Sequence, residues 1–294
     1  MNTIMSYLKP YFKQSIGQFR DKDALSIILS LITKLGICIS LMTFGLVVGY
    51  ILIKGFPHLD SRLFEWHYST QNASMLPAII NTFTMIIFAL ILATPIGILG
   101  AIFLVQYAKS DSVIVAIISI AAETLVGIPS IIYGLFGYLA FVIYFGFGLS
   151  IISGALTLAI MILPLILRNT QESLKSVPQT YKEASFALGA GKLRTIFRVI
   201  LPCAISGILA GVILAIGRIV GESAALLYTS GTVAKIASLN DSGRTLSVHM
   251  YALLSEGQYL TQAYATAVVL LIFVVIINFT SNFLVKKLSP LHIS

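Results

Sequence analysis

Four ionisable residues lie in or at the edge of long apolar stretches, where charge is unexpected: Glu123, Arg168, Arg218 and Glu222. A charge near the centre of a bilayer costs roughly 2.5–3.5 kcal/mol even on a lenient insertion scale, so such groups usually face a cavity or each other. Guanidinium groups suit tetrahedral oxyanions because their donor fork meets two oxygens at once. These residues therefore indicate a polar pathway for an oxyanion, at the interface with a second membrane subunit.

The charged residues belong to two stripes of small and polar residues. One stripe, at helical spacings of three, four or seven, consists of Gly207, Gly211, Arg218, Glu222 and Ala225; the other consists of Glu123, Gly127, Ser130, Gly134 and Gly137. Arg218 and Glu222, four residues apart, are predicted to pair, which lowers the cost of both charges. Gly207/Gly211 and Gly217/Gly221 have the spacing of close helix packing. The alternative interpretation is that both stripes are packing seams with satisfied ion pairs.

The composition places these stripes in a membrane. Of 294 residues, 57% are hydrophobic and only 10% are charged, with a mean hydropathy of +0.96, whereas soluble domains carry about 25% charged residues. The chain is therefore predicted to be an all-α polytopic membrane protein.

Cys38 and Cys203 lie in or beside apolar spans without ligand-type spacing, so neither a disulfide nor a metal site is expected.

Six apolar segments are long enough to serve as transmembrane helices. They are Leu25–Ile53, Pro77–Tyr107, Val113–Phe145, Ile151–Leu167, Pro202–Tyr228 and Ala263–Val285. Thr94-Pro95 is expected to kink or break the second span, and Pro129 to interrupt the third. A short interfacial helix is expected within Ser247–Tyr264. The expected organisation is an N-terminal segment (1–24), a six-helix membrane domain (25–287) and a C-terminal tail (288–294).

The basic residues indicate the orientation. With six spans, one side collects both termini and Lys9, Lys13, Arg20, Lys22, Lys109, Arg168, Lys175, Lys182, Lys192, Arg194, Arg198, Lys286 and Lys287. The other side has Lys54, Arg62, Lys235 and Arg244. The positive-inside rule then makes both termini cytoplasmic. The net charge of +8 reflects membrane orientation, and nucleic acid is not an expected partner.

The longest polar interruption in the second half of the chain runs from Val177 to Pro202. Its pattern predicts a helix over Thr180–Leu188, a glycine break at Gly189–Gly191, and a short basic helix over Lys192–Ile200. Two short helices joined by a sharp turn, on the cytoplasmic side, would suit docking into a cleft of a soluble partner.

The spacing within this segment resembles the EAA loop of ABC importer permeases: Glu-Ala-Ala, three residues, Gly, nine residues, Ile-x-Leu-Pro. The matching positions are Glu183, Ala184, Ser185, Gly189, Val199, Leu201 and Pro202. Ser185 replaces Ala and Val199 replaces Ile, both conservatively. The resemblance implies that this segment couples the membrane domain to an ATPase subunit.

Further stretches resemble the A-type permease subunit of phosphate ABC importers. They are ATPIGILGAIFLVQYA (93–108), ETLVGIPSIIYGLFG (123–137), LPLILRNTQESL (163–174) and GRIVGESAALLYTSG (217–231). The sister C-type subunit has similar motifs and stays an alternative. The resemblance implies the fold of a type I importer in a bacterial cell membrane, with Arg168 and Arg218 important for transport. We expect Arg168 to act at an exit or gate.

The resemblance also implies the partners. They are a sister permease forming a heterodimer, two ATP-binding subunits, an extracytoplasmic phosphate-binding protein, and phosphate itself. No cofactor is expected on this chain, because Gly191-Lys192 is followed by Leu193 and lacks the glycine spacing of a nucleotide loop. ATP and Mg²⁺ would bind the partner ATPase.

Three alternatives remain open. The first is a permease for another oxyanion, such as sulfate, molybdate or phosphonate. The second is a membrane-embedded enzyme, which the absence of the usual catalytic motifs disfavours; His58, His67, His249 and His292 are expected on solvated surfaces. The third is a passive channel, which would not need the polar segment 177–202.

Overall fold

The computed structural model describes residues 24–108, 112–257 and 259–288. The predictions for the N-terminal segment up to residue 23, for Lys109 and for residues 289–294 lie outside these residues. The chain divides into two compact units, Met1–Ile53 and Lys54–Ser294, which are described separately.

The described part of the first unit belongs to one helix, α2 (Ala24–Gly55). Its 32 residues extend about 48 Å at 1.5 Å per residue, more than the ~30 Å of a hydrocarbon core. The prediction of a first span over Leu25–Ile53 is confirmed.

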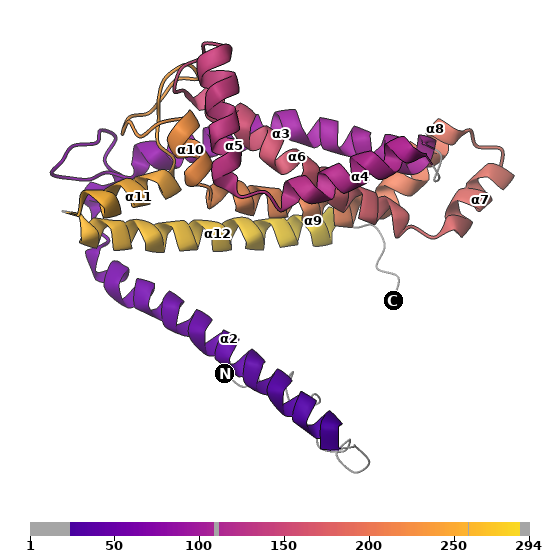
Figure 1. The fold of residues 1–294 in the computed structure, drawn as a ribbon, viewed down its shortest axis with the longest axis horizontal. Coiled ribbons are helices and arrows are strands. Elements are labelled where there is room, and N and C mark those ends of the chain that lie inside the picture. Colours follow the sequence, from indigo (N-terminus) through magenta and orange to yellow (C-terminus); the bar gives the residue numbers. More distant parts are fainter. Residues whose placement is uncertain (1–23, 109–111, 258, 289–294) are drawn as a thin grey trace. The chain divides into compact units, whose positions relative to one another are not determined.

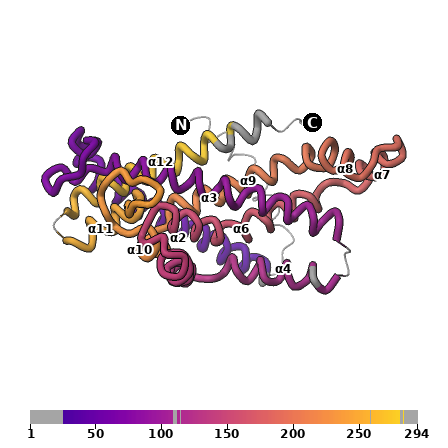
Figure 2. Tube along the Cα trace, turned by 90° about the horizontal axis from the view of Figure 1, so that it is seen from above, coloured from indigo at the N-terminus to yellow at the C-terminus, as the bar shows by residue number. Residues whose placement is uncertain are grey.

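The second unit is all helical over its described residues (Figures 1 and 2). In chain order the elements are η2 (Phe56–His58), η3 (Ser61–Phe64), α3 (Leu76–Ile102), η4 (Phe103–Tyr107), α4 (Val113–Val126), α5 (Ser130–Gly137), η5 (Tyr138–Tyr144), α6 (Ile151–Lys175), α7 (Gln179–Ala187), α8 (Lys192–Thr195), η6 (Ile196–Ile200), α9 (Leu201–Val220), α10 (Ala224–Thr229), α11 (Leu246–Glu256) and α12 (Leu260–Leu288). Here η4, η5 and η6 are π-helical turns that continue the preceding helices.

The number of spans agrees with the sequence. Over the described residues, five helices are long and apolar enough to cross a membrane, and a sixth span is possible if one bent pair is counted. That pair is α4 and α5 with η5, which meet at 103°. The predicted interruption at Pro129 is therefore confirmed. At Thr94-Pro95, where a kink or a break was predicted, α3 continues through Pro95, so the span is not broken there and the kink stays a prediction.

Helix α6 forms the centre of the second unit, with α3 and α9 packed along it (Figure 2). Its buried residues include Ile151, Leu158, Ile162 and Ile166. Close approach of α9 depends on glycine, because a Cβ at Gly211 would lie only 2.6 Å from Cβ of Asn169. A Cβ at Gly207 would similarly collide with Ser173. The first predicted small-residue pair thus packs helices closely.

The second predicted pair, Gly217/Gly221, makes no such contact. Nothing lies within 4 Å of a Cβ at Gly217, and only the backbone of its own helix approaches Gly221. The other stripe is not a single face, since the bend at Pro129 separates Glu123 from the later glycines. Gly134 instead packs closely against Ala225 of α10.

Two predicted span ends are wrong. The fourth span does not end at Leu167, because α6 continues to Lys175; the intervening residues contain no glycine or proline, and Pro178 follows shortly after the helix. The fifth span is not one helix to Tyr228. Helix α9 stops at Val220, and α10 begins at Ala224 after a break that contains Gly221.

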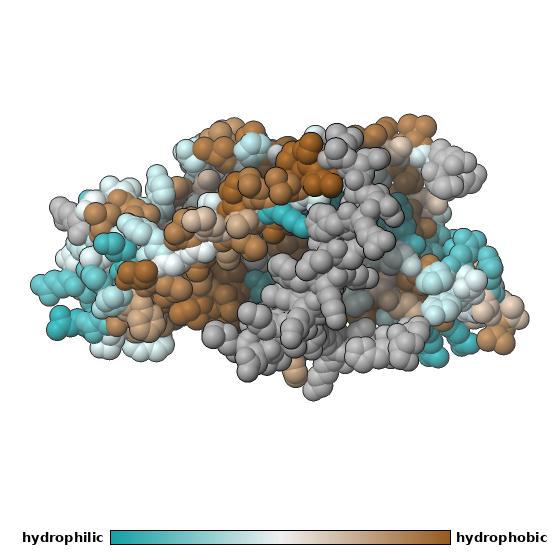
Figure 3. Space-filling model, turned by 90° about the horizontal axis from the view of Figure 1, so that it is seen from below, coloured by the Kyte–Doolittle hydropathy of each residue, from teal (hydrophilic) through white to brown (hydrophobic). Residues whose placement is uncertain are grey.

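The surface of the second unit has an apolar middle. Large apolar side chains such as Ile91 and Ile96 of α3, Leu214 of α9 and Val275 of α12 are exposed, and Figure 3 shows hydrophilic side chains gathered at the left and right ends of the view. This is the pattern of a membrane-embedded unit with two water-facing ends. A short helix, α11 (Leu246–Glu256), is present where one was expected within Ser247–Tyr264, and its interfacial position stays a prediction.

Candidate functional site

The structure joins Glu123 and Arg168, which the sequence did not predict to pair. Arg168 Nη1 on α6 lies 2.8 Å from Glu123 Oε1 on α4. Arg168 Nε also donates to Glu172 Oε1 at 3.2 Å, one turn further along α6. This second contact is possible only because α6 continues past Leu167. Arg168 therefore sits between two carboxylates, one on its own helix and one on α4.

The ion pair between Glu123 and Arg168 is exposed on the single chain, and this exposure indicates what its surroundings must be. The Arg168 and Glu123 side chains are 41% and 65% exposed, and a pair of that kind in water contributes only about 0–1 kcal/mol. Stability alone does not explain it. Exposure of these charges to lipid would be costly, so the face of α4 and α6 that carries them must meet water or another protein.

Arg218 lies in a separate environment. It lines a cavity of about 370 Å³ with Leu165, Ile213, Leu214, Gly217 and Asn278, between α6, α9 and α12. Among the described residues, no carboxylate lies within 4.0 Å of the Arg218 guanidinium. The predicted Arg218–Glu222 pair is therefore not formed. A half-buried guanidinium without a counter-charge beside a cavity is suited to receive an anion.

Glu222 does not pair with Arg218 because α9 ends between them. Only 8% of Glu222 is exposed, and its Oε1 accepts a hydrogen bond of 3.0 Å from the backbone N–H of Ala225. It thus caps the first turn of α10, where a carboxylate is favoured by the helix dipole. Its backbone carbonyl accepts a hydrogen bond from Ser247 of α11.

The polar segment 177–202 forms a compact projection at one end of the second unit (Figure 1). Helix α7 ends in a Schellman motif: the N–H of Ala190 bonds to the carbonyl of Ser185, and the N–H of Gly189 to that of Phe186. Gly189 has φ of +79°, a conformation that costs other residues roughly 1–2 kcal/mol. The glycine of the motif is therefore required by the turn.

A buried hydroxyl pair ties α7 to α8. Ser185 Oγ and Thr195 Oγ1 are 2.8 Å apart, and both side chains are buried. Ser185 stands where the motif has alanine, so this departure from the pattern adds a hydrogen bond that the sequence pattern did not reveal. Glu183, in contrast, is exposed.

Helix α7 also leaves apolar groups exposed. Tyr181 is 37% exposed and Leu188 is 89% exposed, and Ala184 between them is also exposed. These residues recur at three, four and seven positions, so they share one face of the helix. We call Tyr181, Ala184 and Leu188 the α7 face. Exposed apolar groups clustered beside polar ones are typical of a protein-binding surface.

The predicted basic helix Lys192–Ile200 is present, but it is not separate from the next span. Helix α8, the π-helical η6 and α9 follow one another without a gap. Leu201 and Pro202 are the first residues of α9 and follow the π-helical turn η6 directly, so the residue without an N–H lies where the regular α-helical hydrogen-bond pattern is interrupted. Movement of the α7–α8 projection would therefore be passed directly to α9.

At the other end of the unit, Asn81 of α3 holds the loop that precedes α11. Its Nδ2 donates to the carbonyls of Lys235 at 2.9 Å and Arg244 at 3.1 Å, and its Oδ1 accepts from the N–H of Ala237 at 3.1 Å. Asn81 is 1% exposed. One buried amide thus fixes a loop more than 150 residues later in the chain.

The prediction that His249 lies on a solvated surface is wrong, because its side chain is fully buried. Burial, together with the nearby charge of Arg244, lowers the pKa of His249 from 6.5 to about 3, so the imidazole is neutral. Arg244, expected on the outer surface, is itself only 3% exposed, and its guanidinium stacks over the ring of Tyr68 at 4.5 Å.

Some predicted site residues meet and others do not. Glu123 and Arg168 form one contact, Arg218 lines another cavity, and Glu222 caps α10. Sequence reasoning missed Glu172, Thr195 and Asn81. Glu172 could have been found from its spacing of four from Arg168, but no local pattern indicates the long-range contacts of Asn81.

The long apolar helices, the broken span and the central α6 together define an integral membrane subunit. The chain matches the family "Binding-protein-dependent transport system inner membrane component" over residues 93–291, and it belongs to that family. It is thus an inner-membrane transport component, and the family works with a substrate-binding protein.

Individual relatives agree with this assignment. The chain is 36% identical over 206 residues to the probable ABC transporter permease protein YqgI of Bacillus subtilis, covering 67% of this chain and 68% of the relative. It is 31% identical over 247 residues to the phosphate transport system permease protein PstA of Xylella fastidiosa, covering 81% and 84%. It is 35% identical over 174 residues to PstA 2 of Mycobacterium tuberculosis, covering 58% and 57%.

Solved structures show the same fold. The bacterial alginate ABC transporter, in complex with its alginate-bound periplasmic protein, gives a TM-score of 0.67 at 15% identity, covering 90% of this chain and 95% of the other. The inward-facing MetNI methionine ABC transporter gives 0.57 at 19% identity, covering 72% and 93%. The predicted importer transmembrane-domain fold is confirmed.

Proposed function

We propose that this chain is a membrane subunit of an ATP-driven phosphate importer and that it acts beside a sister permease. The observation that carries this proposal is the α7 face, an exposed apolar surface on a projection built at the end of a transport subunit. A passive channel would not need it. A separate ATPase subunit would bind this surface, because the chain has no nucleotide-binding loop of its own.

Phosphate as the transported anion is supported by the relatives, several of which are named phosphate transport permeases and are 30–35% identical. The arginines give a chemical reason. Arg218 beside its cavity and Arg168 on an exposed face both offer guanidinium donors, which suit a tetrahedral oxyanion.

The Glu123–Arg168 contact supports a gate. A carboxylate that occupies a guanidinium competes with an incoming anion, so the anion binds weakly enough to be released. Because the two residues lie on α4 and α6, any relative movement of these helices breaks the 2.8 Å contact and frees the arginine. We assign Arg168 to the exit side of the path, and Glu123 and Glu172 to its control.

The cycle then proceeds by alternating access. Closure of two ATP-bound subunits would draw together the α7–α8 projections of this chain and its sister. The movement would pass through the continuous α8–η6–α9 rod and open the path outward. An extracytoplasmic binding protein would deliver phosphate there, and ATP hydrolysis would restore the inward-facing state.

The test is uptake of radiolabelled phosphate into proteoliposomes that contain the complete transporter, with unlabelled sulfate as competitor. We expect uptake that depends on ATP and is blocked by phosphate but not by sulfate. Absence of ATP-dependent phosphate uptake in a preparation that takes up labelled sulfate would show that the cargo is a different oxyanion.

Arg218 is tested in the same assay. We expect Arg218→Ala to reduce uptake at least about tenfold while the complex still assembles, and Arg218→Lys to rescue it poorly, because an ammonium lacks the donor fork. Arg62→Ala, which removes a 75% exposed arginine of the loop before α3, is the matched control. Wild-type uptake by Arg218→Ala would remove Arg218 from the path.

A further inference from the structure

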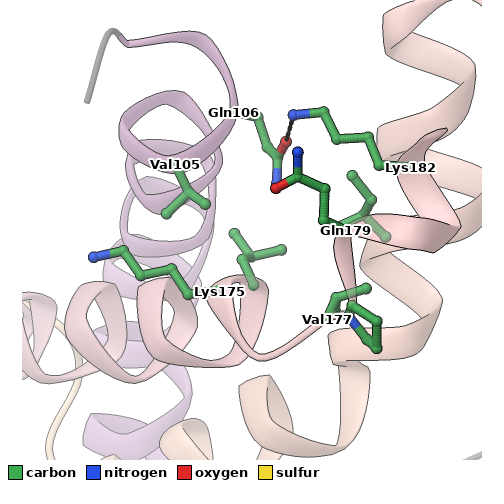
Figure 4. A pocket seen from close by; sticks show the side chains of 9 residues that line it. Val105, Gln106, Lys175, Val177, Gln179 and Lys182 are labelled. Carbon is green, nitrogen blue, oxygen red and sulfur yellow. Dashed lines mark hydrogen bonds between the residues drawn. The ribbon is translucent and has the colours of Figure 1, made fainter.

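A cavity of about 170 Å³ lies between η4, the end of α6 and the start of α7 (Figure 4). Its polar lining comes from Gln106, Lys175, Gln179 and Lys182. On the same measure a single water needs only roughly 10–15 Å³, so the cavity has room for a small hydrated group. It is distinct from the cavity beside Arg218 and from the Glu123–Arg168 pair.

The lining is suited to an anion. It contains two ammonium groups and two carboxamides, and none of its nine residues is a carboxylate. Lys182 Nζ donates to Gln106 Oε1 at 3.3 Å, so the charge has a neutral partner. Figure 4 shows the Gln179 amide beside this pair, whereas the Lys175 ammonium lies on the other side of Val105.

The backbone at the start of α7 also makes the cavity suitable for an anion. Pro178 precedes α7 and gives its first turn no side-chain cap, so the N–H groups of this nine-residue helix begin beside the cavity with partial positive charge. The Lys182 ammonium, the amides of Gln106 and Gln179 and an uncapped helix start therefore meet at one hollow, and Lys175 contributes to its wall. Such a combination favours phosphate groups, as at other helix starts.

The cavity and the α7 face are on different sides of α7. Lys182 is half-buried toward η4, whereas Tyr181 and Leu188 are exposed. Successive helical residues are turned by about 100°, so Lys182 points away from the α7 face. A protein that covers the α7 face therefore does not need to fill the cavity.

We propose that this cavity binds a phosphate group, supplied either by inorganic phosphate on the cytoplasmic side or by the headgroup of an anionic lipid. The bound group would bridge Lys182 and Gln179 of α7 to Gln106 of η4. It would thus brace α7 against the membrane helices and restrain the coupling movement. The regulatory consequence rests on the proposed function, but binding itself does not.

The experiment is hydrogen–deuterium exchange of segment 177–190 in the complete transporter, reconstituted in nanodiscs without ATP. One arm uses neutral lipid with added inorganic phosphate, and the other uses anionic lipid without phosphate; neutral lipid with chloride is the baseline. If the segment must release the phosphate group before it opens, a ligand concentration of about ten times Kd lowers the population of the open segment about tenfold, and its exchange slows by the same factor. We expect slower exchange in at least one arm. Slowing with added phosphate identifies inorganic phosphate as the ligand, and slowing in anionic lipid identifies the lipid headgroup.

Three variants make the result specific. Lys182→Gln should abolish the slowing, and Lys182→Arg should keep it. Lys192→Gln is the matched control, since it removes one charge from the same polar segment 177–202 but outside the cavity lining. Equal slowing in Lys182→Gln and wild type, or none in either arm, would overturn the proposal. Phosphate uptake by the same wild-type preparation in proteoliposomes, without such slowing, would overturn this inference and leave the proposed function standing.

Discussion

The two water-facing ends of the second unit are built by different means. At the end beside α11, a buried amide from α3 holds the loop by three hydrogen bonds, and even a histidine and an arginine are buried. At the α7 end, one hydroxyl pair and a glycine turn hold the projection together, and apolar groups remain exposed. One end is sealed to the core, whereas the other is joined to η4 by the hydrogen bond from Lys182 to Gln106 and leaves apolar groups open to a partner.

The largest expected effect is at the sealed end. Asn81→Leu would remove three hydrogen bonds and leave two carbonyls and one N–H buried without partners, at about 1–3 kcal/mol each. We expect the free energy of unfolding to fall by about 3 kcal/mol or more, measured as thermal unfolding of the purified protein in detergent.

Asn278→Leu is the control for Asn81. Its amide bonds only to the carbonyl of Val274 in its own helix, in an exposed position. A loss of stability as large in Asn278→Leu as in Asn81→Leu would mean that the loop anchor has no special role.

A substitution at the α7 end should change partner binding rather than the stability of the chain. Leu188→Asp changes a side chain that is 89% exposed, so the stability of the isolated chain should hardly change. If an ATPase subunit buries this leucine, the loss of roughly 1.5–3 kcal/mol of apolar burial weakens association about 10- to 100-fold. Binding of the ATPase subunit to the reconstituted permease pair measures this.

Val233→Asp is the control for Leu188, because Val233 is also an exposed apolar residue, at 47%, but lies in the loop before α11. It should leave ATPase binding unchanged. Unaltered binding in Leu188→Asp would remove the α7 face from the coupling contact.

These differences also explain what could be predicted from the sequence. The membrane class, the span count and the α7 turn follow from local signals: long apolar runs, proline at 129, and a glycine where the chain needs a positive φ. The span ends at Lys175 and Val220 were missed, since apolarity marks the bilayer and not the hydrogen-bonded length of a helix.

The contacts of the site were harder to predict than its members. Glu123 and Arg168 were chosen because charge in an apolar span is costly, but their pairing depends on how α4 packs against α6. The Arg218–Glu222 pair was assumed from spacing, which holds only while the helix continues, and α9 ends at Val220. His249 was expected on a solvated surface because it lies in the segment between the fifth and sixth spans, and no local pattern shows that this segment packs against the core.

The buried imidazole gives the sealed end a pH dependence. The pKa of His249 is about 3 in the folded chain and about 6.5 when unfolded. The unfolded chain therefore binds more protons between these values, and stability falls as pH decreases from 6.5. The expected slope is at most about 1.4 kcal/mol per pH unit.

Thermal unfolding between pH 7.5 and 5 would measure this slope, with His249→Gln expected to flatten it. His67→Gln is the control, since His67 is exposed. A slope that is unchanged in His249→Gln would assign the acid sensitivity to other groups.

The smallest expected effect tests how the open end holds itself together. Ser185→Ala and Thr195→Val each break the 2.8 Å hydroxyl pair, and a neutral hydrogen bond contributes about 1 kcal/mol. Each variant should therefore lower the stability of the projection by about that amount, whereas the double variant should cost little more than either alone, giving a coupling energy near 1 kcal/mol. Exchange rates of segment 185–195 supply the measurement. Additive costs would mean that α7 and α8 are held by their backbone turn alone, and the serine in place of alanine would then have no structural role in this chain.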